Sequence, residues 1–396
     1  MKARVPFAER GGALRGVLDV ATGCYPSFLF GGTTRGVLPV FHFHDVTRAW
    51  LEPRLQYLVD NGYRTVTSDE IARLAVDGVD PGPRTVALTF DDAWTSAWTV
   101  ATPLLRQYGL SAVLFAIPGR VKAAPQVRLT STVRLKPDPT AGDPMVVASD
   151  FSRTVDDDEP FATWPELQAM HDSGVIDVQS HTRSHAMIFS DDAVAGFVTP
   201  EYAREPLLNR PVTGANGAGG HIASVGPEAL GTPLFVRRSR MSDARRFFAD
   251  ERLADRCRDH VAQRGGASFF GRSGWRAELE ALLQGPRGGF ESEDARGAAI
   301  RTELADGRAL LNEKLGTASV RHVALPWGIA GDTTRRALRE TGHVTAFAER
   351  PLKRRGVHAG DDPYQLMRLN GKFLTCLPGR GRQWFFTTVR PAIGNQ

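Results

Sequence analysis

Two adjacent carboxylates that follow an apolar run are the first residues of the chain whose types could do chemistry. Residues 86–90 read VALTF and lead directly into Asp91 and Asp92, a pattern typical of a buried strand whose carboxyl end opens into a site. Because neighbouring carboxylates repel, a divalent cation would stabilise the pair by binding one and leaving the other free as a base. Alternatively, the two aspartates begin a solvated turn and cap the next helix.

A pair of histidines follows a second expected strand, at residues 175–179. His181 and His185 lie four residues apart, so both imidazoles face the same way and can share one metal ion if the loop turns helically. Together with Asp92 they form a His-His-Asp set that suits Zn²⁺, Co²⁺, Ni²⁺, Mn²⁺ or Fe²⁺, and an open position for water would make the site catalytic. Two surface histidines can fall four apart by chance, but the strand before them and the aspartates at another strand end favour a metal site.

Three short motifs resemble those of the polysaccharide deacetylases, also known as NodB-homology proteins or carbohydrate esterase family 4. The segments TFDD at 89–92 and SHTRSH at 180–185 resemble the first two motifs of the family, and LPWG at 325–328 resembles the core of the third. The resemblance covers residues 37–117, 160–190 and 318–350, in the order of the family.

This resemblance implies a fold, a cofactor and a division of labour between the aspartates. The fold would be a distorted (β/α) barrel of about seven strands. A divalent transition metal, with zinc the first choice, would be held by Asp92, His181 and His185. Asp91 would be the general base that takes a proton from the attacking water, which the metal holds.

The resemblance also implies how the substrate is held. That water would attack an N-acetyl, or less often an O-acetyl, carbonyl group, and the metal and a backbone N–H near Trp327 would stabilise the oxyanion. We expect Trp94, Pro326 and Trp327 to border the substrate.

Two departures from the family pattern affect the supporting residues. The family usually has an arginine that orients the base two residues before the proline of the third motif, where this chain has Ala324; Arg321 or His322 are alternatives. The family also has a late Leu-x-His whose histidine is the general acid, which is missing here. His44, at the end of the first expected strand, and His322 are candidate acids, and each is alternatively a structural histidine of the core or rim.

The elements around these residues alternate between strand and helix, which predicts an α/β fold. Between the second and third motifs the period changes, and we expect a loop-rich segment at 190–235 followed by three helices, at about 242–263, 275–284 and 293–315. We expect four parts along the chain: an irregular lead-in at 1–36, the first part of the barrel at 37–189, a mainly helical insertion at 190–318, and the end of the barrel with a C-terminal tail at 319–396.

Composition sets the broad class of the protein. The chain has 396 residues, 42% of them hydrophobic, with a net charge of +5, ordinary values for a soluble globular protein. Three separated cysteines indicate neither disulfides nor a zinc–thiolate site. Without an apolar leader or membrane-length segment we expect a cytoplasmic protein. The basic clusters RRSR, RR and KRR, at 237–240, 245–246 and 353–355, could meet an anionic substrate; we favour solvated surface and no nucleic-acid partner, because no nucleic-acid motif accompanies them.

We therefore predict a metal-dependent hydrolase of carbohydrate metabolism that removes acetyl groups from a carbohydrate or a related small amide. A barrel that lost catalysis and kept a metal- or carbohydrate-binding surface is the alternative, since the orienting arginine and the late histidine are missing. A glycosidase that uses Asp91 or Asp92 is a weaker option, because adjacent aspartates are poorly placed to flank a glycosidic bond and the histidines would have no role.

Overall fold

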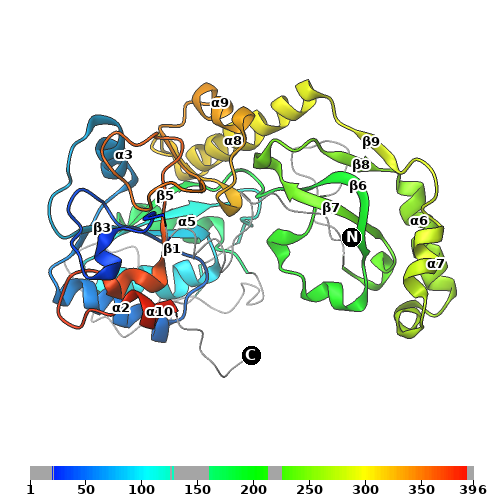
Figure 1. Cartoon of the computed structure of the whole chain (residues 1–396), viewed down its shortest axis with the longest axis horizontal. Helices are drawn as coiled ribbons and strands as arrows, with labels where there is room; N and C mark the ends of the chain where they lie inside the picture. The colour runs from blue at the N-terminus through cyan, green and yellow to red at the C-terminus, as the bar shows by residue number, and fades with distance from the viewer. Residues whose placement is uncertain (1–19, 21, 125–126, 129–159, 213–224, 390–396) are drawn as a thin grey trace. The chain divides into compact units, whose positions relative to one another are not determined.

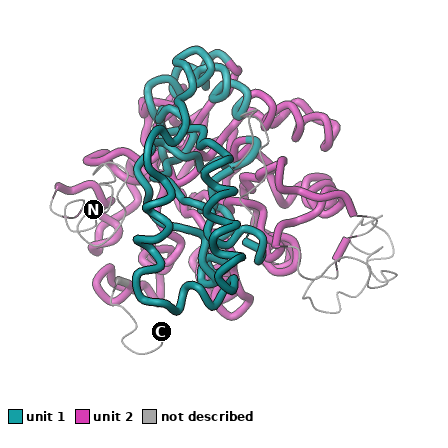
Figure 2. Tube along the Cα trace, turned by 90° about the vertical axis from the view of Figure 1, so that its right-hand side faces the viewer, with its two compact units in different colours: residues 1–9, 183–304, 329–340 teal, residues 10–182, 305–328, 341–396 magenta. Residues whose placement is uncertain are grey.

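The computed structural model describes residues 20, 22–124, 127–128, 160–212 and 225–389. These residues pack into two compact units, which Figure 2 distinguishes. Of the described residues, the barrel unit comprises those from 20 to 182, from 305 to 328 and from 341 to 389, and the insertion unit comprises those from 183 to 304 and from 329 to 340. More than half of the predicted lead-in at 1–36 lies outside the described residues.

A parallel sheet forms the centre of the barrel unit. Its strands follow the order β11-β10-β5-β4-β3-β1-β12, and β2 is added beside β3; β1, β3 and β5 are labelled in Figure 1. The strands of the sheet are β1 (Val40–Phe43), β2 (Arg64–Thr65), β3 (Thr85–Asp92), β4 (Ala112–Ala116), β5 (Ile176–Ser180), β10 (His322–Ala324), β11 (Thr345–Phe347) and β12 (Leu369–Asn370).

The segment around β12 closes this sheet into a ring. Leu369 pairs in parallel with Phe41 of β1, and Leu366, three residues earlier, forms a parallel bridge with Phe347 of β11. Backbone bonds support the bridge, since the Leu366 N–H donates to the Ala346 carbonyl at 3.0 Å. The predicted distorted (β/α) barrel of about seven strands is therefore confirmed.

The helices of the barrel unit begin where the sequence supplies caps. Thr67 and Glu70 form a capping box at the start of α3, so this pair satisfies two backbone N–H groups that would otherwise lack partners. At the start of α5, the Glu166 carboxylate accepts from the Thr163 N–H at 2.8 Å. The helical segment after β3 consists of a π-helical turn followed by α4. The helices are α2 (Arg48–Asp60), α3 (Ser68–Asp77), the π-helix η3 (Ala97–Ala101), α4 (Thr102–Gln107), α5 (Trp164–Asp172) and α10 (Phe385–Val389).

Alternation along the strands decides which side chains face the inside of the ring. Ala87 of β3 packs in one buried cluster with residues of β1, β4, β10 and β11, whereas its neighbours Val86 and Leu88 pack in the cluster that includes α2 and α4. Ala87 therefore faces inward. Because side chains alternate along a strand, Thr89 and Asp91 face inward as well, closer to the carboxyl end.

The insertion unit contains strands where loops were expected. The prediction of loops over 190–235 is wrong at both ends, because β6 (Met187–Phe197) and β7 (Pro233–Ser239) form an antiparallel pair. Its register shifts between Phe189 and Val194, which breaks the regular alternation that marks a strand in sequence. The described residues between these strands are loops and short 3₁₀ helices, as predicted. The predicted helix at 242–263 is shorter, because β8 (Phe247–Ala249) precedes α6 (Glu251–Gln263) and pairs with β9 (Gly288–Phe290).

Two of the three predicted helices of the insertion are confirmed. They are α7 (Trp275–Ala281) and α8 (Glu293–Leu315), and α9 (Asp332–Glu340) follows β10. The domain boundaries at 190 and 318 remain predictions. The basic cluster at 237–246 is not wholly a solvated surface, since Arg240 and Arg246 are buried. The Arg240 guanidinium and the Arg246 backbone N–H both donate to the Glu291 carboxylate.

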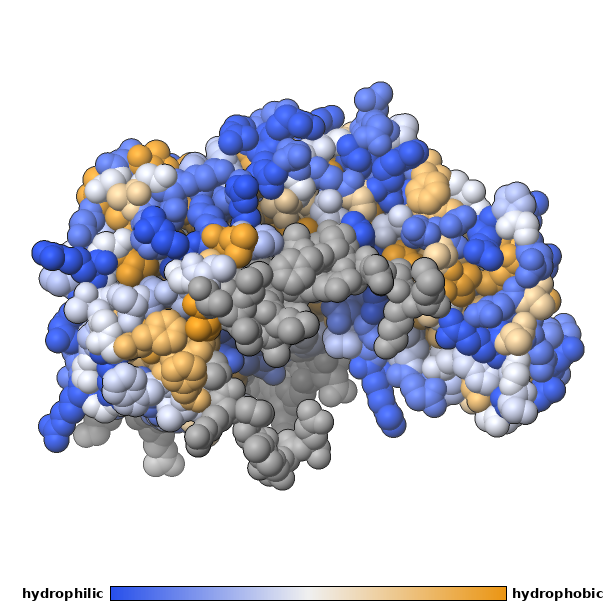
Figure 3. Space-filling model, in the orientation of Figure 1, coloured by the Kyte–Doolittle hydropathy of each residue, from blue (hydrophilic) through white to orange (hydrophobic). Residues whose placement is uncertain are grey.

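The surface mixes polar and apolar residues. On the face drawn in Figure 3, hydrophobic residues gather in small separate patches among hydrophilic ones. Among the described residues the most exposed large hydrophobic side chains include Trp384 and Phe386. All three cysteines are buried and free, and within the described part of the chain no helix is long and apolar enough to cross a membrane.

Candidate active site

Asp91 is held by an arginine from the segment that closes the barrel, directly before β12. Arg368 donates from Nη1 to Asp91 Oδ1 and from Nη2 to Oδ2, both at 2.6 Å, a bidentate geometry that fixes the carboxylate plane. The guanidinium lies 5.6 Å from the Phe115 ring centroid and 5.3 Å from that of Phe347. Burial alone would raise the pKa of Asp91, but Arg368, with His181 and His44, holds that pKa well below its usual range.

Sequence reasoning missed Arg368. The base-orienting arginine was expected near the third motif, with Arg321 as an alternative to Ala324, but Arg321 pairs with Asp69 instead. The signal lay in the segment LMRLN at 366–370, where the two leucines at 366 and 369 pair with the opposite edges of the ring. Arg368 is two residues beyond inward-facing Leu366 and therefore faces inward as well.

Asp92 and His181 lie together at the carboxyl ends of β3 and β5. The distance from His181 Nε2 to Asp92 Oδ1 is 3.3 Å, and both residues are buried. His181 Nδ1 lies 2.7 Å from the Ala324 carbonyl oxygen. A carbonyl oxygen only accepts, so Nδ1 carries a proton and Nε2 is the ring nitrogen directed toward Asp92.

These contacts fit a metal ligand set. A ring that donates from Nδ1 to a carbonyl presents Nε2 in the tautomer that metal binding requires. Burial would lower the pKa of His181, yet Asp92 and Asp91 raise it, because their charges favour a positive charge at this point. A divalent cation bound by Asp92 and His181 would supply the positive charge that the two aspartates favour at this point.

His185 follows on the loop that leaves β5. The potential ligand atoms of Asp92, His181 and His185 all lie within 4.8 Å of one another. The backbone N–H and hydroxyl of Ser184 donate to the Glu303 carboxylate, at 3.0 and 2.5 Å. Glu303 thus anchors the residue next to His185, a support that the sequence did not reveal.

Backbone strain gathers at the same places. Asp92, Ala93, Thr182, His185 and Trp327 all have φ between 54° and 72°, a region in which residues other than glycine are uncommon. Each such conformation costs about 1–3 kcal/mol and persists only where surrounding contacts impose it. All five belong to the three motif segments or follow them directly.

His42 and His44 approach Asp91 from the neighbouring strand. His42 belongs to β1, which pairs with β3, and His44 directly follows β1. His44 Nε2 is 3.9 Å from Asp91 Oδ2, and its side chain is 53% exposed. The His42 ring meets that of His44 edge-on, with centroids 5.7 Å apart. Burial lowers the pKa of His42 to about 3, so the ring is neutral. The two histidines and Asp91 also form a group with ligand atoms within 4.8 Å, although Arg368 already neutralises Asp91.

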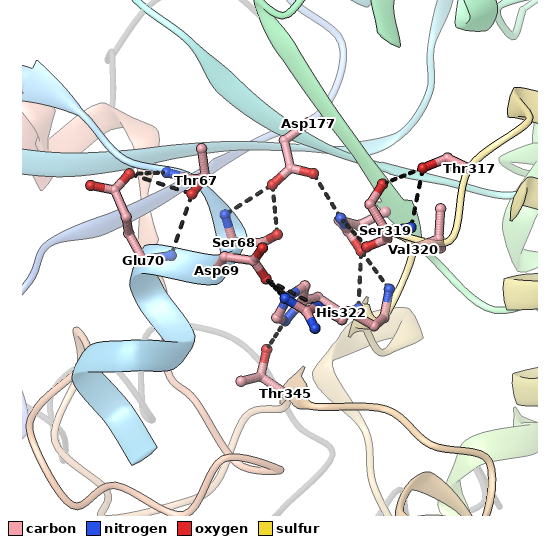
Figure 4. Close-up of polar contacts among 12 residues, drawn as sticks. Thr67, Ser68, Asp69, Glu70, Asp177, Thr317, Ser319, Val320, His322 and Thr345 are labelled. Carbon is pink, nitrogen blue, oxygen red and sulfur yellow. Dashed lines mark hydrogen bonds and ion pairs between the residues drawn. The ribbon is translucent and has the colours of Figure 1, made fainter. Parts of the chain in front are cut away.

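His322 is not brought to this end of the barrel. It is the first residue of β10, and Figure 4 shows it between Asp69 of α3 and Thr345 of β11. His322 Nε2 lies 2.8 Å from Asp69 Oδ1, and Nδ1 lies 2.8 Å from Thr345 Oγ1. The side chain is fully buried. The expectation that His322 is a general acid therefore has no support in the structure, because both ring nitrogens are occupied at the amino ends of the strands.

The three residues expected to border the substrate differ in their surroundings. Trp94 Nε1 donates to Asp92 Oδ2 at 2.9 Å, and the ring centroid of Trp94 lies 5.0 Å from that of Phe161. Trp94 therefore orients Asp92, which is a proposed metal ligand. Trp327 is 37% exposed, whereas Pro326 is buried. Of the two, Trp327 is the one whose side chain is accessible to a substrate.

Comparison with known families agrees with this geometry. Residues 78–207 match the family model described as polysaccharide deacetylase, and this segment contains both aspartates and both histidines of the candidate site. The segment belongs to the polysaccharide deacetylase family. Arg368 and His44 lie outside this polysaccharide deacetylase segment.

Relatives of the polysaccharide deacetylase segment match in part. A putative polysaccharide deacetylase of Bacillus subtilis, YxkH, is 31% identical over 88 residues, which are 20% of this chain and 32% of that protein. The match thus spans about a third of the length of that relative.

Three solved structures are similar at low sequence identity. The BpsB deacetylase domain from Bordetella bronchiseptica is 17% identical, with 85% of this chain and 95% of that one covered and a TM-score of 0.48. IcaB from Ammonifex degensii is 17% identical, with coverages of 86% and 95% and a TM-score of 0.45. A de-N-acetylase from Aggregatibacter actinomycetemcomitans is 16% identical, with coverages of 78% and 87% and a TM-score of 0.43.

Proposed function

We propose that this protein is a metal-dependent hydrolase that removes acetyl groups from an N-acetylated carbohydrate, with an O-acetyl group or a related small amide as the alternative target. The observation that carries the proposal is the Asp91–Arg368 ion pair directly beside the Asp92–His181 pair. One carboxylate is thereby held as a base while its neighbour is available as a ligand.

The metal would be bound by Asp92, His181 and His185, for which zinc suits the nitrogen and oxygen donors. When bound there, it would supply Lewis-acid polarisation of the acetyl carbonyl group. Trp94 orients Asp92 through its indole N–H, and the Ala324 carbonyl fixes the tautomer of His181.

Asp91 acts as the general base in this scheme. Arg368 keeps the carboxylate ionised and fixes its orientation, so that Asp91 takes the proton of the attacking water. His44 then donates a proton to the leaving amine, because its Nε2 lies 3.9 Å from Asp91 Oδ2 and its side chain is open to solvent. We propose that Trp327 borders the acetylated sugar.

The alternative of a barrel that only binds metal or carbohydrate rested on two missing residues. Arg368 contacts the base although Ala324 cannot, and His44 approaches the base although no late Leu-x-His is present. Both observations favour an active enzyme over a binding module.

Metal content and acetate release test the proposal together. Wild type and His181→Ala are reconstituted with Zn²⁺, Co²⁺ or Ni²⁺, bound metal is measured, and acetate release from N-acetylglucosamine oligomers is followed. We expect wild type to hold metal and release acetate, and His181→Ala to lose both. His171→Ala, on the half-buried last turn of α5, is the control and should behave as wild type.

Two results would contradict parts of the proposal. A wild-type protein that binds none of the three metals would refute the ligand assignment. A protein that binds metal but releases no acetate from a broad panel of acetylated sugars would instead support the binding module.

A further inference from the structure

We infer that an exposed aromatic patch on the barrel unit binds the surface of an anionic phospholipid membrane. The patch consists of Phe30, Trp384 and Phe386, which are 39%, 62% and 66% exposed. A hydrophobic patch of Figure 3 lies where Figure 1, in the same orientation, places α10. Large apolar side chains that gather on a surface mark a site of interaction with a protein or a membrane. This inference is independent of the proposed function, since it uses no residue of the candidate active site.

Two segments that are far apart in the chain form the aromatic patch. The Phe30 ring, at the end of the 3₁₀ helix η2 (Ser27–Phe30), lies 6.3 Å from the Phe386 ring of α10, measured between centroids. A Cβ atom placed on Gly31 would lie 3.4 Å from the Trp384 ring, so the indole rests on the backbone directly after Phe30. The three exposed side chains are therefore neighbours in space.

Buried contacts beneath the aromatic patch hold it in place. Phe385 is buried, and its ring stacks on that of Phe373, with centroids 5.2 Å apart, and lies 4.9 Å from that of Phe30. The Arg382 guanidinium donates to the Gly31 carbonyl oxygen at 3.0 Å and so joins the two segments. Because these contacts fix the patch before a partner binds, little ordering entropy is lost on binding.

Basic residues accompany the aromatic ones. The two segments, 22–36 and 371–389, contain four cations and no carboxylate; the cations are Arg35, Lys372, Arg380 and Arg382. Lys372 Nζ lies 5.0 Å from the centroid of the Phe373 ring that supports the patch, and Arg380 is exposed. Exposed tryptophan and phenylalanine beside lysine and arginine are typical of a surface that inserts among anionic lipid head groups.

Charge also decides between a membrane and a second copy of this chain. In a symmetric dimer the same patch of each subunit meets itself, so the cations of one copy would face those of the other, and like charges across an interface are costly. An anionic membrane meets the patch with the opposite charge. The indole of Trp384 combines an apolar body with a polar N–H, which suits the boundary between head groups and acyl chains.

Sedimentation with vesicles tests the inference on the whole chain. We expect wild type to bind vesicles of equimolar phosphatidylcholine and phosphatidylglycerol at low salt, and to bind pure phosphatidylcholine vesicles more weakly. Added salt should weaken binding to the mixed vesicles, because it screens the attraction. Trp384→Ala combined with Phe386→Ala should reduce binding about 10-fold or more, through lost apolar burial. Arg380→Gln should reduce it about fivefold, the effect of removing one cation near an anionic surface.

Two matched substitutions outside the aromatic patch are the controls. Leu352→Ala removes a leucine that is 60% exposed, and Arg73→Gln removes an exposed arginine of α3. Both should bind the mixed vesicles as wild type does. If Arg73→Gln weakened binding as much as Arg380→Gln, the attraction would belong to the basic chain as a whole, and the assignment to the patch would be wrong.

Fluorescence quenching locates the contact. Brominated phosphatidylcholine in the mixed vesicles quenches indoles that reach the acyl chains, so wild type should be quenched on binding. Trp384→Phe keeps an aromatic ring at this position and should keep most of the binding, but it should lose most of the quenching. This conservative variant tests the patch even if the double alanine variant folds poorly. Equal quenching of wild type and Trp384→Phe would place another tryptophan at the membrane and overturn the inference.

Other outcomes separate this inference from its alternatives. If wild type does not bind the mixed vesicles, or if the double alanine variant binds them as tightly, no membrane surface lies at the patch. A dimer in solution that the double alanine variant abolishes, without vesicle binding, would assign the patch to a second copy instead. Acetate release from a soluble oligosaccharide should be equal in wild type and the double alanine variant. Vesicle binding without any acetate release would uphold the membrane surface and refute the proposed function.

Discussion

The two ends of the barrel carry nearly the same residue types in different arrangements. At the carboxyl end, Asp91 contacts Arg368 and approaches His44. At the amino end, Asp69 contacts Arg321 and His322, as Figure 4 shows for the histidine. An aspartate with an arginine and a histidine is therefore not in itself a site.

Strain and hydrogen-bond satisfaction distinguish the two ends. His322 uses both ring nitrogens, on Asp69 and Thr345, so the amino-end network is complete and joins α3 to two strands. At the carboxyl end the motif segments contain backbone conformations with positive φ. Five such costly conformations lie in or directly after the motif segments, where we propose the chemistry, whereas Arg84, directly before β3, has one at the amino end.

The largest expected contrast is between the two histidines. His44→Ala should lower turnover of acetylated oligosaccharide about 10²–10⁴-fold with metal retained, because a general acid contributes that much. His322→Ala should leave turnover within about twofold and lower the free energy of unfolding by about 1–3 kcal/mol, since it leaves buried partners unsatisfied. Steady-state kinetics and urea unfolding measure both. Equal losses of turnover would remove the distinction between the two ends.

The two arginines give a smaller contrast. Arg368→Met should reduce kcat about 10–100-fold, the usual effect of losing a group that orients a catalytic or ligand residue, with zinc content unchanged. Arg321→Met is the matched substitution at the amino end and should change kcat little. If Arg321→Met slowed the reaction as much as Arg368→Met, the base would not depend on its ion pair.

The smallest effect is a pH-dependent one at the amino end. The hydrogen bond from His322, against partial burial and with Arg321, lowers the pKa of Asp69 from its usual 3.8 to about 2. A lowered carboxyl pKa stabilises the fold above the unfolded value, and this contribution is lost as the pH falls toward 2. Asp69→Asn should therefore cost about 1 kcal/mol or less at pH 7, because solvent screens the half-exposed carboxylate.

Thermal unfolding at several pH values checks the contribution of Asp69. The difference between wild type and Asp69→Asn should shrink as the pH falls below about 3.8. A difference that grew on acidification would contradict the assigned pKa shift. Turnover at pH 7 should be unaffected by the substitution.

The sequence predicted the parts of the site that follow long, strongly patterned strands. The eight residues of β3 are all buried, so their apolar run and the aspartates at its end were visible. Arg368 was not, because β12 has two residues and the contact with Asp91 spans 277 positions of the chain. A strand this short has too few positions to display its alternation.

His322 was assigned to the site for a related reason. Its proximity in sequence to the third motif suggested proximity in space, but it is the first residue of β10, at the amino end of that strand, whereas Pro326 and Trp327 follow the strand. Only residues after a parallel strand reach the carboxyl end of the barrel. The boundaries of the three-residue strand β10 therefore decide which end of the barrel a nearby residue reaches. Strand boundaries are the feature that sequence patterns predict least well.

The segment that closes the ring has a consequence for the order of events during synthesis. Residues 363–370 supply the partner of both β1 and β11, and they also carry Arg368. A nascent chain that has emerged only as far as β11 holds Asp91 and Asp92 side by side with no guanidinium to offset their repulsion. Closure of the ring and neutralisation of the base are thus one late step, and partly synthesised chains carry the motifs without a working site.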